Sequence, residues 1–298
     1  MPDSLKVLAN GLEQHVLEWP CDGPVAGPTV LLVHGYMDAA ATWDLVAPAL
    51  TAQGFRVLAP DVRGYGDGAR VSSGGYYHFV DYVFDLADLV EQLVPAGSPL
   101  FLVGHSMGGT IANMFAGTFP ERVTRLALLE GAGPPDNAHE VGPARMRRWI
   151  EDVRAIRARP PRRMATREDA LRRLVGNHPR VAEDVLRRRL EALSCDVPGG
   201  GVAWKADPLH GTRSPLPFFA ASWSAFARRV TCPVLFVSGG PLGWHPADEE
   251  TRVSAFATLQ RAEIRDAGHM MHWTEPAKLT RLLLQFFAGD VIPGALSP

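Results

Sequence analysis

The amino-acid sequence predicts an α/β fold in which helices cover both faces of a mostly parallel central sheet. Short apolar runs alternate with amphipathic helical segments along most of the chain, and this alternation is typical of parallel sheets. The chain has 298 residues, of which 46% are hydrophobic and 21% are charged, and this suits one large domain with an insertion. No apolar stretch approaches the length of about 18 residues that a membrane-spanning helix needs.

Each element is predicted from its local pattern. An antiparallel pair opens the chain at residues 5–9 and 13–19, because Asn10-Gly11 between them is a strong hairpin dipeptide. Residues 79–94 form the clearest helix, since their apolar side chains fall on one stripe. The remaining apolar runs predict strands at residues 30–33, 55–59, 100–103, 123–129, 234–237 and 263–264. The remaining helical periodicities predict helices at residues 43–50, 111–119, 144–158, 166–175, 179–193, 217–229, 249–259 and 276–287.

The middle of the chain differs in charge from its flanks. Residues 134–230 contain 18 Arg and 1 Lys against 11 acidic residues, a net charge of +8, whereas the rest carries 11 basic and 21 acidic residues, a net charge of −10. The middle segment has helical spacing, and Thr166 with Asp169 forms a capping-box pattern. We therefore predict a helical cap domain at residues 134–230, inserted after the sixth strand of a core domain formed by residues 1–133 and 231–298.

A five-residue motif lies between an apolar run and a helix-like segment rich in small residues. It reads Gly104-His105-Ser106-Met107-Gly108 and matches G-x-S-x-G. In this strand-turn-helix context the motif is a nucleophile elbow, a tight turn that exposes a serine hydroxyl above a parallel sheet. The flanking glycines are needed because helix and strand nearly touch there. The motif predicts that Ser106 is a nucleophile.

Three further motifs follow in order around the elbow. They are His34-Gly35-Tyr36 after the third strand, residues 61–66 after the fourth, and Ala267-Gly268-His269 before the last helix. With these motifs, the chain resembles an α/β-hydrolase fold serine hydrolase with a helical cap inserted after strand 6. The run from Leu128 to Pro135 and Thr231-Cys232-Pro233 are similar to the serine hydrolase-like and carboxylesterase subgroup. The resemblance covers nearly the whole chain.

Ser106 needs a base, because a serine hydroxyl is a poor nucleophile until an imidazole accepts its proton. We assign His269, which lies in a Gly-His turn downstream of the serine and before the last helix, as the chain order of this fold requires. His272 is the alternative, and we expect it to cap or pack instead. The two histidines could also form an H-x-x-H metal pair, but no third ligand cluster accompanies them in the sequence, so we expect no metal.

The acid departs from the commonest pattern of the family that the chain resembles. Most relatives place an Asp three residues beyond the Gly that ends the seventh strand, and counting from Gly239 that position is Leu242. Asp248 and Glu249 come later in the same loop. We instead assign Glu130, which ends the sixth strand, where some members of the fold, notably haloalkane dehalogenases, keep their acid. The alternative is that Glu130 caps a strand or pairs with a cap arginine.

The remaining site residues are expected from loops and from the cap. The backbone N–H groups of Tyr36 and Met107 are expected to form an oxyanion hole, and Asp61 and Arg63 to hold the loop after the fourth strand. The arginines of the cap could steer anionic substrates, although a solvated helical face is the simpler interpretation. Substrate contacts are expected from Tyr36, Met107, Trp149, Phe218, Phe219 and Trp223.

These assignments predict a serine esterase that cleaves carboxylic esters through a Ser106-His269-Glu130 triad and an acyl-enzyme. Serine at the elbow argues against the haloalkane dehalogenases and epoxide hydrolases of this fold, which use aspartate there. The alternatives are an acyltransferase, a lactonase, a carbon-carbon bond hydrolase and a catalytically weak ligand-binding protein. We expect a cytoplasmic monomer or homodimer that acts on small-molecule esters, without a cofactor and without nucleic-acid or membrane partners.

Overall fold

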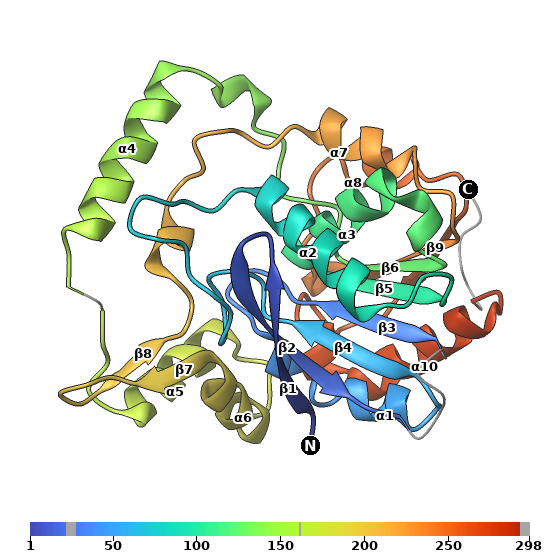
Figure 1. Cartoon of the computed structure of the whole chain (residues 1–298), viewed down its shortest axis with the longest axis horizontal. Helices are drawn as coiled ribbons and strands as arrows, with labels where there is room; N and C mark the ends of the chain where they lie inside the picture. The colour runs from blue at the N-terminus through green and yellow to red at the C-terminus, as the bar shows by residue number, and fades with distance from the viewer. Residues whose placement is uncertain (22–27, 161, 293–298) are drawn as a thin grey trace.

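The central sheet contains eight strands in the order β1-β2-β4-β3-β5-β6-β9-β10 (Figure 1). The computed structural model describes residues 1–21, 28–160 and 162–292. β1 pairs antiparallel with β2, and β2 with β4, whereas the pairs from β4 to β10 are parallel. The predicted mostly parallel sheet is therefore confirmed. The strands are β1 (Asp3–Ala9), β2 (Leu12–Trp19), β3 (Thr29–Val33), β4 (Arg56–Pro60), β5 (Leu100–His105), β6 (Arg125–Leu129), β9 (Val234–Ser238) and β10 (Leu259–Glu263).

Helices cover both faces of this sheet, as predicted. Leu31 and Val33 of β3 pack into the core on one face, and Val30 and Leu32 pack into the core on the other, because successive side chains of a strand point to opposite faces. None of the helices in the described ranges has both the length and the apolar character needed to cross a membrane. The first face is covered by α2 (Phe79–Leu93), α3 (Met107–Thr118), α7 (Ala220–Ala227) and α8 (Glu249–Val253), and the second by α1 (Ala47–Thr51), α9 (Met271–Thr274) and α10 (Pro276–Ala288).

The turn between β1 and β2 follows from its two residues. Asn10 has φ 46° and Gly11 has φ 74°, the left-handed conformation that a tight hairpin turn requires at both positions. The register pairs Ala9 with Leu12, so the loop has only these two residues. The backbone N–H of Asn10 also donates to the carboxylate of Asp88 in α2 at 2.7 Å, which ties the hairpin to that helix.

Between β6 and β9 the chain leaves the sheet. It forms α4 (Pro143–Arg157), α5 (Arg167–Asn177), α6 (Glu183–Leu193), a hairpin of β7 (Ser194–Asp196) and β8 (Val202–Trp204), and then α7. Figure 1 shows α4 at the upper left, and α5, α6 and the hairpin at the lower left. Leu171 and Leu190 belong to a separate apolar cluster that reaches Trp273 of the core. The hairpin is not predicted by the sequence, because such short strands carry no periodicity.

The last helix of this inserted segment, α7, packs on the core. A Cβ at Gly117 of α3 would lie 2.5 Å from the carbonyl oxygen of Phe226, so the two helix backbones are in close contact. The side-chain amide of Asn113 donates to the carbonyl oxygen of Trp223 at 3.0 Å. The cap range expected from the sequence, 134–230, thus includes a helix that covers the sheet, and the division into domains stays a prediction.

Candidate active site

Ser106 lies at the sharp turn between β5 and α3. Its φ of 51° and ψ of −117° fall in a backbone region that residues with side chains rarely adopt. The flanking glycines are required by space: a Cβ at Gly104 would lie 2.4 Å from the carbonyl oxygen of Gly108, and one at Gly108 would lie 2.2 Å from that of Val33. The strained turn is therefore held by backbone contacts that only glycine permits.

The side chains of Ser106, His269 and Glu130 form one hydrogen-bonded chain. The Oγ atom of Ser106 is 2.9 Å from Nε2 of His269, and Nδ1 of His269 is 2.7 Å from Oε2 of Glu130. Since an ionised carboxylate only accepts, Nδ1 carries the proton and Nε2 is left to accept from the serine hydroxyl. The side chain of His269 is 33% exposed and that of Glu130 is fully buried. The structure thus brings together three residues that are far apart in the sequence, in the geometry of a nucleophile, base and acid.

Glu130 is enclosed by the loop that follows β9. The backbone N–H groups of Gly239 and Trp244 donate to its two oxygens, each at 2.6 Å. A Cβ at Gly243 would lie 1.8 Å from Oε1, so any larger residue there would collide with the carboxylate. These donors stabilise a negative charge that burial alone would disfavour. Leu242, in the position where most relatives place the acid, is 48% exposed.

The other acidic residues of this loop are engaged elsewhere. Asp248 pairs with Arg252 at 2.6 Å, and Glu249 lies 3.1 Å from Nδ1 of His245. No motif in the sequence marks Gly239, Gly243 and His245 as neighbours of the acid. The dense Gly239-Gly240-Pro241-Leu242-Gly243 run was the available signal, because a loop with several glycines can approach another side chain closely.

The two segments that carry the expected oxyanion donors adjoin the nucleophile. A Cβ at Gly35 would be 3.1 Å from Cβ of Ser106, which places the loop that carries Tyr36 directly beside the serine. Met107 is the first residue of α3, and the first N–H groups of a helix have no partner within it. The hydroxyl of Tyr36 donates to the carbonyl oxygen of His210 at 3.0 Å, which connects this loop to the inserted segment.

A second histidine-carboxylate pair lies beneath the site. Nε2 of His272 is 3.0 Å from Oδ2 of Asp38, and His105 donates from Nε2 to the carbonyl oxygen of His269 at 2.8 Å. Burial lowers the pKa of His105 and of His272, so both imidazoles are neutral near pH 7. His272 is expected from the sequence to pack rather than to catalyse, and its side chain is fully buried.

Three atoms of this group, one each from Asp38, His105 and His272, lie close enough together to be considered as metal ligands. However, the carboxylate of Asp38 already accepts from the N–H of Ala39 at 2.9 Å, from the hydroxyl of Thr42 at 2.6 Å and from His272. Because three donors already bind this carboxylate and the rings come from the end of β5 and from α9, we interpret the group as a structural hydrogen-bond network.

The aromatic residues expected to contact substrate fall into different environments. Tyr36 and Phe219 are 51% and 42% exposed. Trp149 packs edge-on against Tyr76, and Phe218 lies under the guanidinium of Arg252, 5.3 Å from ring centroid to Cζ. Trp223 is only 2% exposed and packs against Phe256, so its predicted contact with substrate does not fit the structure. An aromatic residue on a short helix gives no sequence signal that separates core packing from a binding surface.

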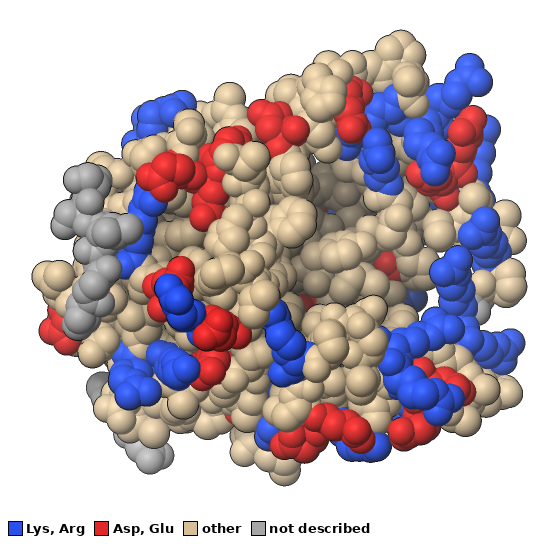
Figure 2. Space-filling model, turned by 180° about the vertical axis from the view of Figure 1, so that it is seen from behind, with Lys and Arg blue, Asp and Glu red and all other residues tan. Residues whose placement is uncertain are grey.

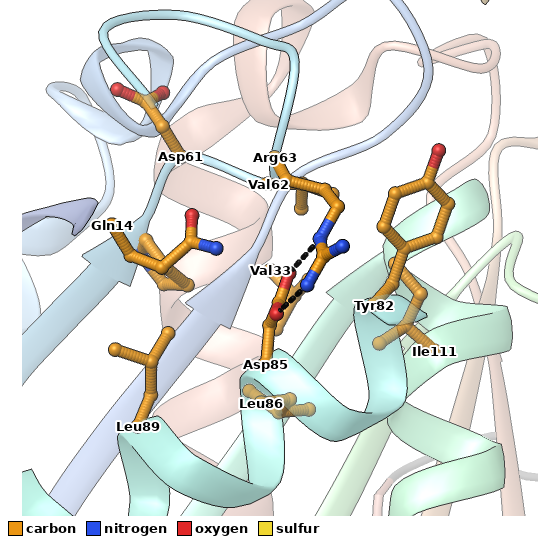
Figure 3. A pocket seen from close by; sticks show the side chains of 11 residues that line it. Gln14, Val33, Asp61, Val62, Arg63, Tyr82, Asp85, Leu86, Leu89 and Ile111 are labelled. Atoms are coloured by element: carbon orange, nitrogen blue, oxygen red, sulfur yellow. Dashed lines mark hydrogen bonds and ion pairs between the residues drawn. The ribbon is translucent and has the colours of Figure 1, made fainter. Parts of the chain in front are cut away.

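Asp61 and Arg63 hold the loop after β4. Asp61 accepts from the N–H of Ala40 at 2.7 Å and from His15 at 2.6 Å, and Nε of Arg63 donates to Asp85 at 2.5 Å. Figure 3 shows this ion pair beside a small pocket, with the side chain of Gln14 on its other side. The cavity is about 20 Å³, enough for a single water molecule and far too small for a substrate.

The α/β-hydrolase class of enzymes is defined by a mostly parallel sheet with two loops at its edge. Here these are the elbow after β5 and the histidine loop after β10. The chain belongs to the alpha/beta hydrolase fold family, whose model matches residues 28–276. The family and fold inferred from the motifs are thereby confirmed.

Two relatives and one solved structure illustrate the similarity. Human serine hydrolase-like protein 2 is 25% identical over 280 residues, which cover 89% of this chain and 88% of that protein. Pig bifunctional epoxide hydrolase 2 is 26% identical over 292 residues, but the match covers 89% of this chain and 52% of that protein, so this chain spans about half of it. The crystal structure of hypothetical protein PA1622 from Pseudomonas aeruginosa PAO1 is 27% identical, has a TM-score of 0.82 and covers 96% of this chain and 99% of its own. Family and relatives support hydrolase activity.

Proposed function

We propose that this protein hydrolyses carboxylic esters through an acyl-enzyme on Ser106. The observation that carries the proposal is the hydrogen-bonded chain from Ser106 through His269 to Glu130, with distances of 2.9 and 2.7 Å. Epoxide hydrolases of this fold use an aspartate at the elbow, and serine here favours acyl transfer instead. The similarity to human serine hydrolase-like protein 2 supports this choice.

The reaction would proceed in two halves. Oγ of Ser106 attacks the carbonyl carbon while its proton passes to Nε2 of His269, and Glu130 stabilises the imidazolium that forms. The N–H groups of Tyr36 and Met107 bind the oxyanion, and each such donor contributes on the order of a hundredfold in rate. The imidazolium then protonates the departing alcohol. Water repeats the attack on the acyl-enzyme, which releases the carboxylic acid and restores Ser106.

The exposed side chains near the nucleophile suggest an apolar acyl or alcohol group. Tyr36 and Met37 on the oxyanion loop are 51% and 44% exposed, and Leu242 and Trp244 on the loop that encloses Glu130 are 48% and 47% exposed. Apolar side chains left open to water on two adjacent site loops are typical of a ligand-binding surface.

The test is hydrolysis of p-nitrophenyl esters from acetate to laurate by the purified protein. Ser106→Ala should reduce turnover on the order of 10⁴-fold or more, and Glu130→Gln on the order of 10²-fold or more. Asp248→Asn is the matched control, since it removes the same charge from the same region, and it should retain activity. Full activity in Glu130→Gln would overturn the acid assignment. If no ester is hydrolysed and a fluorophosphonate does not label Ser106, a ligand-binding role is favoured.

A further inference from the structure

Glu130 lies between two histidines. His269 contacts Oε2, whereas Nε2 of His245 lies 3.9 Å from Oε1. His245 comes from the loop that encloses Glu130, directly after Trp244, whose N–H donates to the carboxylate. Its side chain is 35% exposed, while that of Glu130 is fully buried. The acid therefore has a second imidazole beside it that takes no direct part in the hydrogen-bonded chain to Ser106.

The contacts of His245 determine its charge. Nε2 is 2.9 Å from the carbonyl oxygen of Gly240, and Nδ1 is 3.1 Å from both oxygens of Glu249. A carbonyl and an ionised carboxylate can only accept hydrogen bonds, so both ring nitrogens must donate. Only the doubly protonated imidazolium satisfies both contacts. The geometry places a positive charge next to the buried negative charge of Glu130.

We propose that His245 is a positioning residue for the reaction: as an imidazolium fixed between Gly240 and Glu249, it holds the loop around Glu130, places a positive charge beside that carboxylate and keeps it directed at His269. This inference rests on the proposed function of the site. The loop backbone supplies two N–H donors to Glu130, and His245 fixes the same loop at Gly240 and at α8. A change at His245 would therefore move the donors that hold the carboxylate. A Cβ at Gly243 would also lie 2.9 Å from Nε2 of His245, which shows how tightly this loop is packed.

The proposal gives the reaction an alkaline limit. Partial burial opposes the charge on His245, but the Gly240 carbonyl and the Glu249 carboxylate outweigh it and raise the pKa of His245. Burial also raises the pKa of the Glu249 carboxyl. As the pH rises through the raised pKa of His245, the imidazolium is lost and Glu130 loses its compensating charge. Activity should then fall on the alkaline side.

Other charged or titratable groups also face this pair: His269 contacts Glu130, and Nη2 of Arg180 from the inserted segment lies 3.5 Å from the carbonyl oxygen of Leu242 in the same loop. The acidic groups that raise the pKa of His245 are Glu130, directly after β6, and Glu249 of α8.

The positive charge of Arg261 in β10 opposes the rise in the pKa of Glu249. The guanidinium of Arg261, however, forms its ion pair with Glu250, through both carboxylate oxygens. Glu250 therefore offers a matched control, because it is adjacent in sequence to Glu249 on the same helix and pairs away from His245.

The experiment compares pH profiles of kcat/KM for the intact chain and four variants with one p-nitrophenyl ester. His245→Gln should lower kcat about tenfold with little change in KM and remove the alkaline limb, because a neutral amide carries no titrating charge. Glu249→Gln should move the alkaline limb down by about one pH unit. His245→Lys should restore much of the rate and move the limb upward, since an ammonium keeps its charge to higher pH. Glu250→Gln should match the unaltered protein.

A nitrogen-15 NMR titration of His245 tests its charge without relying on catalysis. The imidazole should titrate above about pH 6.5 in the unaltered protein and lower in Glu249→Gln. A neutral imidazole at pH 7, or an alkaline limb that is identical in His245→Gln and Glu249→Gln to the unaltered profile, would overturn the proposal. Lack of any ester turnover together with a high pKa for His245 would instead count against the proposed esterase function while supporting the charge state inferred here.

Discussion

The molecule contains two histidine-carboxylate pairs whose histidines are three residues apart, His269 with Glu130 and His272 with Asp38. The first imidazole is 33% exposed and reaches Ser106, whereas the second is fully buried and packs against Trp43 with the rings tilted by 33° and their centroids 4.6 Å apart. Each pair has the residue types of a catalytic base and its acid. The difference shows that access and a nucleophile within reach, rather than the identity of the pair, make a histidine chemically useful.

The two pairs also differ in what holds them. His269 lies in a loop after Gly268, which has φ 65°, and its carboxylate is fixed by a second loop. His272 lies in α9, and its carboxylate accepts from Thr42 and Ala39 inside the core. We therefore expect substitutions in the first pair to change catalysis and substitutions in the second to change stability.

The largest expected effect is that of His269→Ala. Removal of the base should lower kcat for an ester substrate by on the order of 10⁴-fold, because the serine hydroxyl then has no proton acceptor. The midpoint of thermal unfolding should change little, since the side chain is 33% exposed. Steady-state kinetics and a thermal melt measure both. Comparable loss of activity in correctly folded His272→Ala would show that the division between the two pairs is wrong.

Asp38→Asn should show the reverse behaviour. The substitution weakens charge-assisted hydrogen bonds from Ala39, Thr42 and His272, and it should reduce the free energy of unfolding by about 2 kcal/mol. The rate per active site, counted by fluorophosphonate labelling, should stay within a few-fold of the unaltered protein. Urea unfolding gives the free energy. A stable Asp38→Asn protein with low kcat would make Asp38 part of the catalytic machinery.

The buried pair should also make the fold sensitive to acid. Burial opposes ionisation of Asp38, but the hydrogen bond and charge interaction with His272 outweigh it and hold the pKa of this carboxyl below its usual range. The ionised carboxylate therefore adds to the free energy of unfolding above about pH 4. This stabilisation is lost as the pH falls through the lowered pKa. His272 has a lowered pKa because it is buried, so its protonation in the unfolded state reduces stability below about pH 6.5. The unfolding midpoint in urea should decrease from pH 7 to pH 4, and less steeply in His272→Leu.

The smallest expected effect concerns the inserted segment, which faces the first pair. Arg180, between α5 and α6, places Nη2 where a Cβ of Gly268 would be 2.1 Å away, and the same atom lies 3.5 Å from the carbonyl oxygen of Leu242. Figure 2, which views the molecule from behind, shows a hollow in that face, with Lys and Arg side chains gathered toward the side of the inserted segment.

Arg180→Gln should therefore raise KM for p-nitrophenyl hemiglutarate, which carries a carboxylate, and leave KM for the neutral p-nitrophenyl butyrate unchanged. The increase should be only about threefold, because solvent screens exposed charges. Arg173→Gln, another exposed arginine of the same segment, is the control. Equal effects on both esters would mean that these arginines form only a solvated surface.

The core of the fold could be predicted from the sequence because its signals are local. The Asn10-Gly11 turn, the alternation of strands and helices, and the glycines around Ser106 each depend on neighbours in the chain.

Two bounds in the core are wrong: the helix predicted at residues 249–259 ends at Val253, and the strand predicted at residues 263–264 is β10, Leu259–Glu263. The apolar side chains of Val253, Phe256 and Leu259 continue a helical spacing, which hid the start of the strand. In the inserted segment the helices lie close to their predicted ranges, but two features were missed. The β7-β8 hairpin and the packing of α7 on α3 depend on contacts between residues far apart, which periodicity does not report.

The sequence by itself determined the family and the elbow motif, and it favoured His269 over His272 as the base, because these follow from motif order and from glycines that specific turns require. Only the tertiary structure decided how Glu130 is held. Its carboxylate is buried by Gly239, Gly243 and Trp244, more than a hundred residues downstream, and Gly243 leaves the space that the acid fills. The physical reason is that burying a charge requires donors from several segments at once, and their convergence is a property of the folded chain.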